Sequence, residues 1–215
     1  MKSIHLSESG FFGEEIANLG RVPAMLNRCA YMRMAVFMER DGVLNRVQTR
    51  GKNQVSPLTL EEFQVNEEAI MPLRQLKAAG FLLVVTTNQP ELSRGHLNRR
   101  ELDRMHSALK ATFPLDDILV CPHDEMDECP CRKPRRGLFT EAAFKWQIDL
   151  ERSFVIGGHW RDAQAAANVG CLSVMLESPW LGTGHHDMVL PDLAAAAQWI
   201  GEVLSPVPQP LATCG

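Results

Sequence analysis

Stretches typical of buried strands alternate along this chain with stretches typical of helices. The run 81–86, FLLVVT, is almost wholly apolar, as expected of a strand covered on both faces. The next periodic segment, 98–112, places Leu102, Met105 and Leu109 on one side of a helix. Because strands that alternate with helices build parallel sheets, the sequence predicts an α/β fold of three layers: a mostly parallel sheet with helices on both faces.

The same alternation extends over most of the chain. We expect further strands at 34–38, 117–121, 153–156 and 172–176, and a short edge strand at 188–190. Helices are expected at 66–79, 138–146 and 161–169, and a last helix that Asp192 caps and that runs to residue 203. The polar segment 46–60 contains glycine and proline and is predicted to be a loop, which is either part of a substrate site or a plain connector.

The 215 residues suffice for one α/β domain, which we place at 33–204. Residues 1–32 have no clear period beyond a short helical stretch at 14–19, and we interpret them as an N-terminal extension. The proline-rich residues 205–215 are predicted to be a disordered tail. The sequence has no internal repeat and no insertion long enough for a second folded domain, so we expect no large cap domain.

The formal net charge of −4 argues against a protein that binds nucleic acid through a basic surface. No apolar run reaches the length of a membrane span, and the N-terminus lacks the basic start and continuous apolar core of a signal peptide. We therefore expect a cytoplasmic protein that contacts neither nucleic acid nor membrane. For one compact domain, a monomer is the default expectation.

An acidic turn follows the first predicted strand, in the stretch 36–45, VFMERDGVLN. Glu39 and Asp41 stand at the carboxyl end of the strand, where open α/β sheets bind ligands, and Gly42 allows a sharp turn. Two carboxylates at this spacing can divide the work of a nucleophile or metal ligand and a general acid or base. The alternative is a surface turn that is acidic by chance.

Three of the six cysteines crowd into eleven residues with a histidine: Cys121, His123, Cys129 and Cys131. Three thiolates and an imidazole can close a tetrahedral zinc site, whose role would be structural because no position stays open. The spacing is not that of a zinc finger, so we predict a zinc-stapled loop. Arg132 and Lys133 follow directly; the loop aims Lys133 at the carboxylates, or the two form a solvated basic pair.

These pieces together resemble the haloacid dehalogenase (HAD) superfamily of phosphatases, subfamily IIIA. The matching segments are Arg40–Asn45, Thr87–Gln89 with Arg94 and Gly95, the C-P-H-x5-C-x-C-R-K-P motif at 121–134, and Asp162. The likeness covers about residues 34–200 and is greatest to the small, capless, zinc-containing members: the heptose 1,7-bisphosphate phosphatases and the histidinol-phosphate phosphatase domains. It implies a Rossmann-like HAD fold.

The resemblance also implies roles for individual residues. Glu39 stands at the position of the nucleophile, and Asp41 at that of the general acid and base. Thr87 would hydrogen-bond the phosphoryl group, and Lys133 would offset its charge. Mg2+ would be held by Glu39, by the backbone oxygen of Asp41 and by Asp162. The candidates for holding the rest of the substrate are Asn45, Asn88, Arg94 and Arg132.

Two positions depart from the pattern of the family. The nucleophile position carries Glu39 instead of aspartate, and its extra methylene moves the attacking oxygen by about an ångström, a shift that can cost about a hundredfold in rate. Gly158 stands where the family has a magnesium-binding aspartate, and glycine offers no side-chain ligand. We expect a phosphatase that acts on a sugar phosphate or a similar small phosphorylated metabolite. The alternative is a non-catalytic member that binds a phosphorylated ligand or a protein partner.

Overall fold

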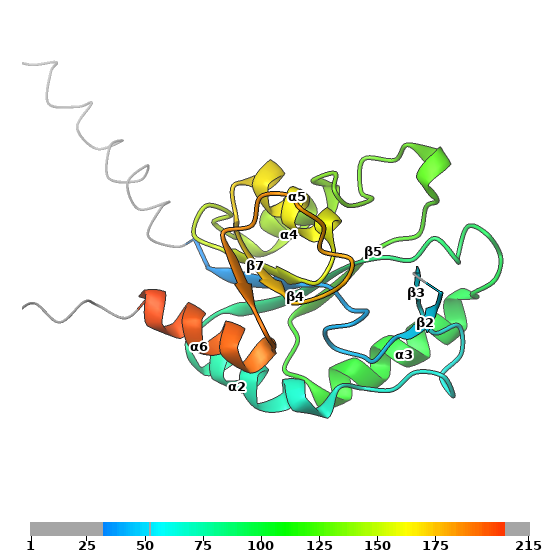
Figure 1. Ribbon diagram of the computed structural model, residues 1–215, viewed down its shortest axis with the longest axis horizontal. Helices are drawn as coiled ribbons and strands as arrows, with labels where there is room; N and C mark the ends of the chain where they lie inside the picture. Colours follow the sequence, from blue (N-terminus) through cyan, green and yellow to red (C-terminus); the bar gives the residue numbers. More distant parts are fainter. Residues whose placement is uncertain (1–31, 52, 205–215) are drawn as a thin grey trace, which may run out of the picture. The chain divides into compact units, whose positions relative to one another are not determined.

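The computed structural model describes residues 32–51 and 53–204 (Figure 1). The predicted N-terminal extension, with its helical stretch at 14–19, lies outside the described residues except for Met32. The predicted tail at 205–215 lies outside them altogether, so both stay predictions.

A six-stranded parallel sheet forms the middle layer. Its strands are β1 (Ala35–Met38), β4 (Leu82–Asn88), β5 (Asp117–Cys121), β6 (Phe154–Gly157), β7 (Leu172–Leu176) and β8 (Met188–Leu190), in the order β5-β4-β1-β6-β7-β8. The central strand β1 is fully buried, and its Phe37 pairs with Val84 on one side and Val155 on the other. All six predicted strands therefore form, and their carboxyl ends meet at one edge of the sheet.

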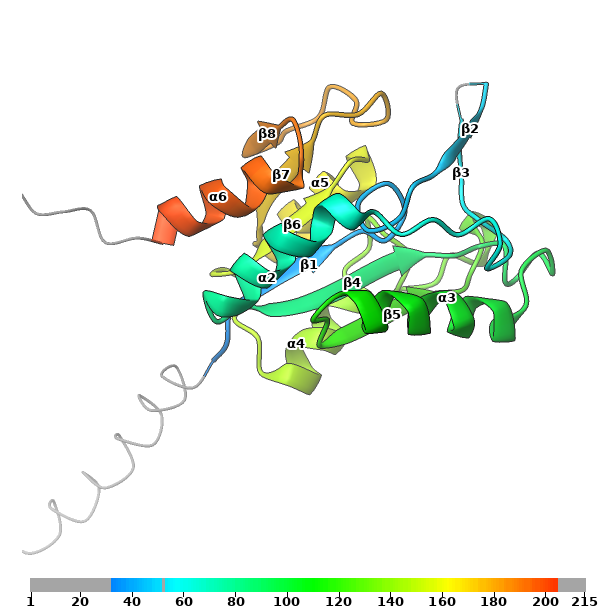
Figure 2. The same cartoon turned by 90° about the horizontal axis from the view of Figure 1, so that it is seen from below.

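Helices cover both faces of the sheet, as Figures 1 and 2 show. One face carries α2 (Ile70–Ala78), α3 (Arg99–Thr112) and α6 (Leu193–Leu204), and the other carries α4 (Gly137–Trp146) and α5 (Trp160–Val169). Asp192 accepts a hydrogen bond from the Ala195 backbone N–H at 2.8 Å, which confirms it as the cap of the last helix. The three-layer α/β fold is confirmed.

The segment 46–60 is more ordered than predicted. It contains an antiparallel hairpin of β2 (Gln48–Arg50) and β3 (Asn53–Val55), with Gln48 paired to Val55. The strands are short and polar and bury no apolar face, so no alternation in the sequence announces them. The predicted helix at 66–79 also differs at its start, where Glu67–Ala69 forms a 3-10 turn before α2.

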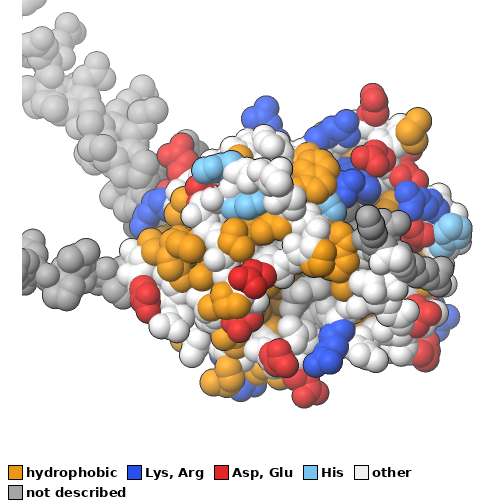
Figure 3. Space-filling model, viewed as in Figure 1, with side chains coloured by type: hydrophobic (Ala, Val, Ile, Leu, Met, Phe, Trp, Pro, Cys, Tyr) orange, Lys and Arg blue, Asp and Glu red, His pale blue; other side chains and the backbone are white. Residues whose placement is uncertain are grey.

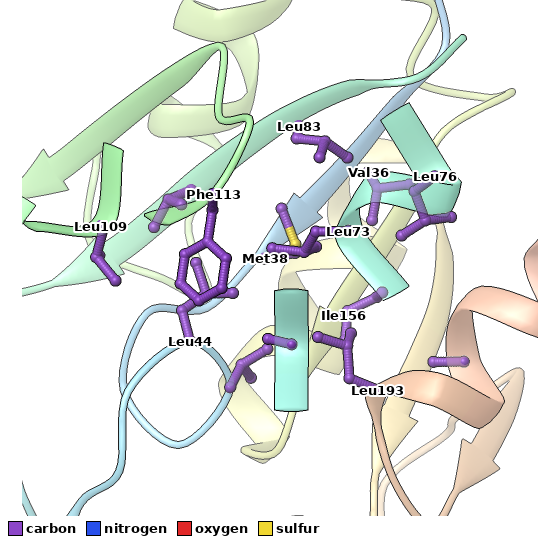
Figure 4. Packing of buried hydrophobic residues seen from close by; sticks show 14 of the residues in the cluster. Val36, Met38, Leu44, Leu73, Leu76, Leu83, Leu109, Phe113, Ile156 and Leu193 are labelled. Carbon is purple, nitrogen blue, oxygen red and sulfur yellow. The ribbon is translucent and has the colours of Figure 1, made fainter. Parts of the chain in front are cut away.

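Two apolar clusters fill the spaces between the sheet and its helices. Figure 4 shows the larger one, in which Val36, Met38 and Ile156 of the sheet lie against Leu73 and Leu76 of α2. The second cluster packs Phe37 edge-on against Phe139 of α4, with ring centroids 5.0 Å apart. Because β1 contributes to both clusters, the turn that follows it leaves from a strand held firmly on two sides.

The surface carries no large field of one sign on the face seen in Figure 3, where Lys and Arg side chains are interspersed with Asp and Glu. Within the described ranges, no helix combines the length and the apolar character needed to cross a membrane.

We expect Leu73→Ala to lower the free energy of unfolding by about 2–5 kcal/mol, because it leaves a cavity under α2, where Leu73 is fully buried. The matched control is Met71→Ala in the same helix. Met71 is 60% exposed, and its replacement should change the free energy by about 0.5 kcal/mol or less. Urea unfolding followed by circular dichroism measures both, and equal effects would contradict this packing.

Candidate active site

The acidic turn begins where β1 leaves the sheet. The Glu39 backbone N–H donates to the carbonyl of Ile156 on β6 at 3.0 Å, and the chain then folds back so that Leu44 N–H donates to the Arg40 carbonyl at 2.9 Å. Gly42 has a φ of +83°, a conformation that side-chain-bearing residues rarely adopt. The buried strand and the glycine together fix Glu39 and Asp41 at the carboxyl edge of the sheet.

Asp41 is held by several donors at once. The Arg40 guanidinium, fully buried, donates from Nε to Oδ1 at 2.9 Å and from Nη2 to Oδ2 at 3.0 Å. Ser56 Oγ and Gln89 Nε2 donate to the same Oδ2 at 2.7 and 2.9 Å. Burial alone would raise the pKa of the Asp41 carboxyl, but Arg40 and these hydrogen bonds outweigh burial and lower the pKa below its ordinary value. Asp41 is therefore an anion at neutral pH.

Lys133 lies between the two other acids of the site. Its ammonium donates to Glu39 Oε2, to Asp162 Oδ1 at 2.6 Å and to the Thr86 carbonyl at 2.8 Å, and only 1% of its side chain is exposed. Burial works against the charge, but Asp162 and Glu39 raise the pKa of Lys133 to about 12. The prediction that Lys133 points at the carboxylates is thus confirmed, and a solvated basic pair is wrong for this residue.

Glu39 also meets Thr87, whose hydroxyl donates to Glu39 Oε1 at 2.6 Å. The same Oε1 accepts the Arg40 backbone N–H at 2.9 Å. Burial is the main reason that the pKa of the Glu39 carboxyl lies above its ordinary value; Asp162 and Asp41 add to this, and Lys133 opposes it. Glu39, Thr87 and Lys133 therefore converge on one point.

Asp162 reaches the site from the first turn of α5. Its Oδ2 accepts the His159 backbone N–H at 3.1 Å, so this carboxylate caps its own helix and binds Lys133 at once. A side chain at Gly157 would overlap Asp162, whereas a Cβ at Gly158 would meet Ser178 Cβ at 3.4 Å, an ordinary contact. Position 158 therefore has room for a Cβ, but the chain places no side chain there.

A cavity of about 470 Å3 opens over these residues. Glu39, Asp41 and Lys133 line it, and Gln54 of β3 and Ser56, which directly follows β3, form part of its wall. The segment 46–60 is therefore not a plain connector, because some of its residues line the cavity. The remaining wall includes Asn88, Arg132, His159, Arg161, Asp162, Ser178 and Trp180.

Two of the predicted substrate-binding residues do not line the cavity. Asn45 is 1% exposed, and its Nδ2 donates to the Arg46 carbonyl at 3.0 Å. Arg94 is bound to Asp124 through two hydrogen bonds of 2.6 and 2.8 Å and to Glu91 through one of 2.6 Å. The spacing of the motif did not reveal that Arg94 is already ion-paired with Asp124 and Glu91.

Asn88 lines the cavity but is engaged with the protein. Its Oδ1 accepts the Lys133 backbone N–H at 3.0 Å, and its Nδ2 donates to the Lys133 carbonyl at 3.2 Å. This pair of bonds ties the end of β4 to the segment that carries Lys133. The structure therefore gives Asn88 a positioning contact, in addition to its place on the wall.

Several residues of the site had no predicted role: Arg40, Ser56, Gln89, His159 and Arg161. Arg40 and Gln89 belong to the matching segments Arg40–Asn45 and Thr87–Gln89. A charged or amide side chain next to a buried strand was the sequence signal that could have identified them as site residues. Ser56 comes from a hairpin fifteen positions away from Asp41, and the sequence gives no sign of that contact.

The cysteine and histidine residues form a tight cluster at the end of β5. Their ligand atoms all lie within 4.8 Å of one another, with Sγ–Sγ distances of 3.6 Å between Cys121 and Cys129 and 3.4 Å between Cys129 and Cys131. His123 Nδ1 lies 3.3 Å from Cys131 Sγ. Sulfur atoms bound tetrahedrally to zinc at about 2.3 Å stand about 3.8 Å apart, so the group could hold such an ion.

The residues present fit a magnesium ion poorly. Mg2+ needs hard oxygen ligands in a nearly octahedral arrangement. Position 158 supplies none, both oxygens of Asp162 already accept from Lys133 and His159, and both oxygens of Glu39 accept from the protein. A magnesium ion here would have to share Glu39 with these donors and use the Asp41 backbone oxygen, with no side-chain ligand from position 158. The weakened magnesium site stays a prediction.

Comparison with known proteins identifies relatives of this chain. A model of the family described as HAD-hydrolase-like matches residues 130–196. The chain is 33% identical over 181 residues to the D-glycero-beta-D-manno-heptose-1,7-bisphosphate 7-phosphatase of Bordetella bronchiseptica, covering 76% of this chain and 95% of that protein. It is 30% identical over 189 residues to the enzyme of the same name from Escherichia coli K12, covering 81% and 92%.

The fold agrees with these relatives. The crystal structure of the B. bronchiseptica D,D-heptose 1,7-bisphosphate phosphatase, complexed with magnesium and phosphate, superposes with a TM-score of 0.69 at 28% identity, over 80% of this chain and 99% of that one. The fold is that of a HAD-like hydrolase. Within that class, the chain belongs to the family of the heptose 1,7-bisphosphate phosphatases.

The bonds to Asp41 predict how stability depends on pH. Because folding lowers the pKa of Asp41, its contribution to stability is present above its ordinary pKa of 3.8 and is lost as pH falls through the folded value. We expect Asp41→Asn to destabilise the protein by about 3–5 kcal/mol at neutral pH, since it leaves the buried Arg40 unpaired, and by less in acid.

Urea unfolding of both proteins at neutral pH and below pH 3.8 measures this difference. The matched control is Asp103→Asn, which removes an exposed ion pair with Arg99 and should cost about 1 kcal/mol or less. An Asp41→Asn effect that stays constant with pH would contradict the assigned bonds.

Proposed function

We propose that this protein is a phosphatase that acts on a sugar phosphate of the heptose 1,7-bisphosphate type. The observation that carries the proposal is the convergence of the Thr87 hydroxyl and the Lys133 ammonium on the Glu39 carboxylate, which lines the cavity. A small bisphosphate fits a volume of about 470 Å3. The names of the relatives support the class of substrate.

In the proposed reaction, a Glu39 oxygen attacks phosphorus, the bond from phosphorus to the sugar oxygen breaks, and an acyl phosphate forms. Water then attacks that phosphorus and releases phosphate, which restores the carboxylate. Thr87 orients the phosphoryl group and Lys133 offsets its charge. Asp41, an anion at neutral pH, is suited to accept the proton of the attacking water. It must take up a proton before it can protonate the leaving sugar oxygen.

A second function is favoured by Glu39 and Gly158. The longer side chain displaces the attacking oxygen relative to an aspartate at this position. The missing ligand at position 158 weakens the magnesium site. A family member that holds a phosphorylated ligand without turning it over would keep the cavity, Thr87 and Lys133 and still carry both changes.

Phosphate release from heptose 1,7-bisphosphate distinguishes the two functions. We expect slow release by the natural protein and a gain of about a hundredfold or more in the Glu39→Asp/Gly158→Asp double variant. The aspartate at position 39 would restore the position of the attacking oxygen, and the aspartate at position 158 would add a metal ligand. Asp41→Asn, prepared in parallel, controls for contaminating phosphatases. Release that is absent from the natural protein but present in the double variant would rule out turnover by the natural protein and favour the binding function, and absence from both would contradict the phosphatase proposal.

We further propose that the cluster of Cys121, His123, Cys129 and Cys131 holds Zn2+ as a structural staple. Three thiols and an imidazole suit zinc, and a filled tetrahedron leaves no position for a substrate. Among the described residues these cysteines form no disulfides. Such thiolates persist in a reducing compartment, which supports a cytoplasmic location. The monomeric state stays a prediction.

Metal analysis of the purified protein tests the zinc proposal. We expect about one zinc ion per chain, loss of that zinc in Cys129→Ser, and a lower melting temperature because the ion closes the loop. Cys171→Ser is the matched control, since Cys171 is also buried and free but lies outside the cluster. Protein without zinc, or a Cys129→Ser variant that keeps it, would contradict the assignment.

A further inference from the structure

Two guanidinium groups line the cavity without a carboxylate at hydrogen-bond distance. Arg132 donates to the His123 backbone carbonyl at 3.2 Å. Arg161 contacts the His159 ring at 3.2 Å and lies over the Trp160 ring at 4.9 Å. Its nearest acid among the described residues is Glu125 at 3.8 Å, and Glu125 is 72% exposed. Arg94 shows the contrast, since three short hydrogen bonds already tie it to two acids.

Lys133 cannot donate to a ligand while its present contacts persist. An ammonium has three N–H donors, and those of Lys133 are engaged by Glu39, Asp162 and the Thr86 carbonyl. It contributes positive charge but no free hydrogen bond. The free donors of charged side chains on this wall are therefore those of Arg132 and Arg161, which are of the planar kind that binds phosphate through two bonds.

Three of the four acids that line the cavity are compensated by buried cations; the fourth, Glu177, is exposed. Asp41 is paired with Arg40, and Glu39 shares Lys133 with Asp162. A divalent cation would have to displace these partners, and Gly158 gives it no carboxylate in return. The weak fit of magnesium and the two guanidinium groups without a close carboxylate partner are found in one cavity.

We propose that this cavity binds a phosphomonoester dianion without a divalent cation, held by the guanidinium groups of Arg132 and Arg161 beside the charge of Lys133. The proposal rests on the proposed function, in that the ligand is a phosphate ester. Arg161 lies in the first turn of α5, three residues after Gly158, so it brings positive charge to the side of the cavity where a metal ligand is missing. Arg161 is a binding residue of this chain that the family resemblance did not indicate.

Calorimetric titration with inorganic phosphate, using the full chain freed of magnesium by dialysis without a chelator, tests this proposal. Leaving out the chelator preserves any metal in the Cys/His cluster. We expect dissociation constants that agree within about twofold with and without added Mg2+, which corresponds to a difference well below that of one charged hydrogen bond. Arg161→Gln should weaken phosphate binding about tenfold or more under both conditions.

The matched control is Arg104→Gln, which removes the same charge from α3, where Arg104 pairs with Glu101 outside the cavity. It should leave the dissociation constant unchanged. Arg161→Lys keeps the charge, and binding between that of the natural protein and that of Arg161→Gln would support a direct contact. Near-ultraviolet circular dichroism verifies that each variant is folded.

Each result has one meaning. Phosphate that binds only with Mg2+ overturns metal-free binding and leaves the phosphatase proposal intact. Binding under neither condition overturns both, because the cavity is then not a phosphate site. Unchanged affinity in folded Arg161→Gln overturns the assignment of the ligand to Arg161.

Discussion

The buried ammonium of Lys133 is the contact on which the site depends. It joins Glu39 at the end of β1, Asp162 on α5 and the backbone of β4, so three elements distant in sequence share one charge. Two carboxylates so deep in a protein would repel each other strongly without a cation between them. Removing Lys133 would therefore do more than remove a catalytic charge, because Glu39 and Asp162 would have to move apart or take up protons.

The Cys/His cluster lies close in sequence to Lys133, which is on an irregular segment. Cys129 and Cys131 come just before Lys133, and Cys121 ends β5, so a bound ion would tie this segment to the edge of the sheet. Asn88 adds two hydrogen bonds to the backbone of Lys133 from β4. A zinc ion bound there as proposed would help to position Lys133 without itself taking part in the chemistry.

The chain combines the residues of the proposed phosphate site with changes at the proposed metal position. Thr87, Lys133 and Asp41 are the groups proposed to act in phosphoryl transfer, while Glu39 would change the reach of the nucleophile and Gly158 offers no side-chain ligand. Arg132 and Arg161 offer positive charge in the same cavity. The two proposals meet here, since a phosphate ester can be bound by guanidinium groups whether or not its turnover is fast.

The sequence by itself determined the order of strands and helices, the acidic turn, the cysteine and histidine cluster and the missing side chain at position 158. These features are local: apolar periodicity, spacing within a motif or the identity of one residue. Only the tertiary structure decided that Arg94 is occupied by Asp124, that Asn45 is buried and that Ser56 reaches Asp41 from a polar hairpin. Such contacts join segments whose spacing along the chain carries no period, and competing partners are visible only once the chain is folded.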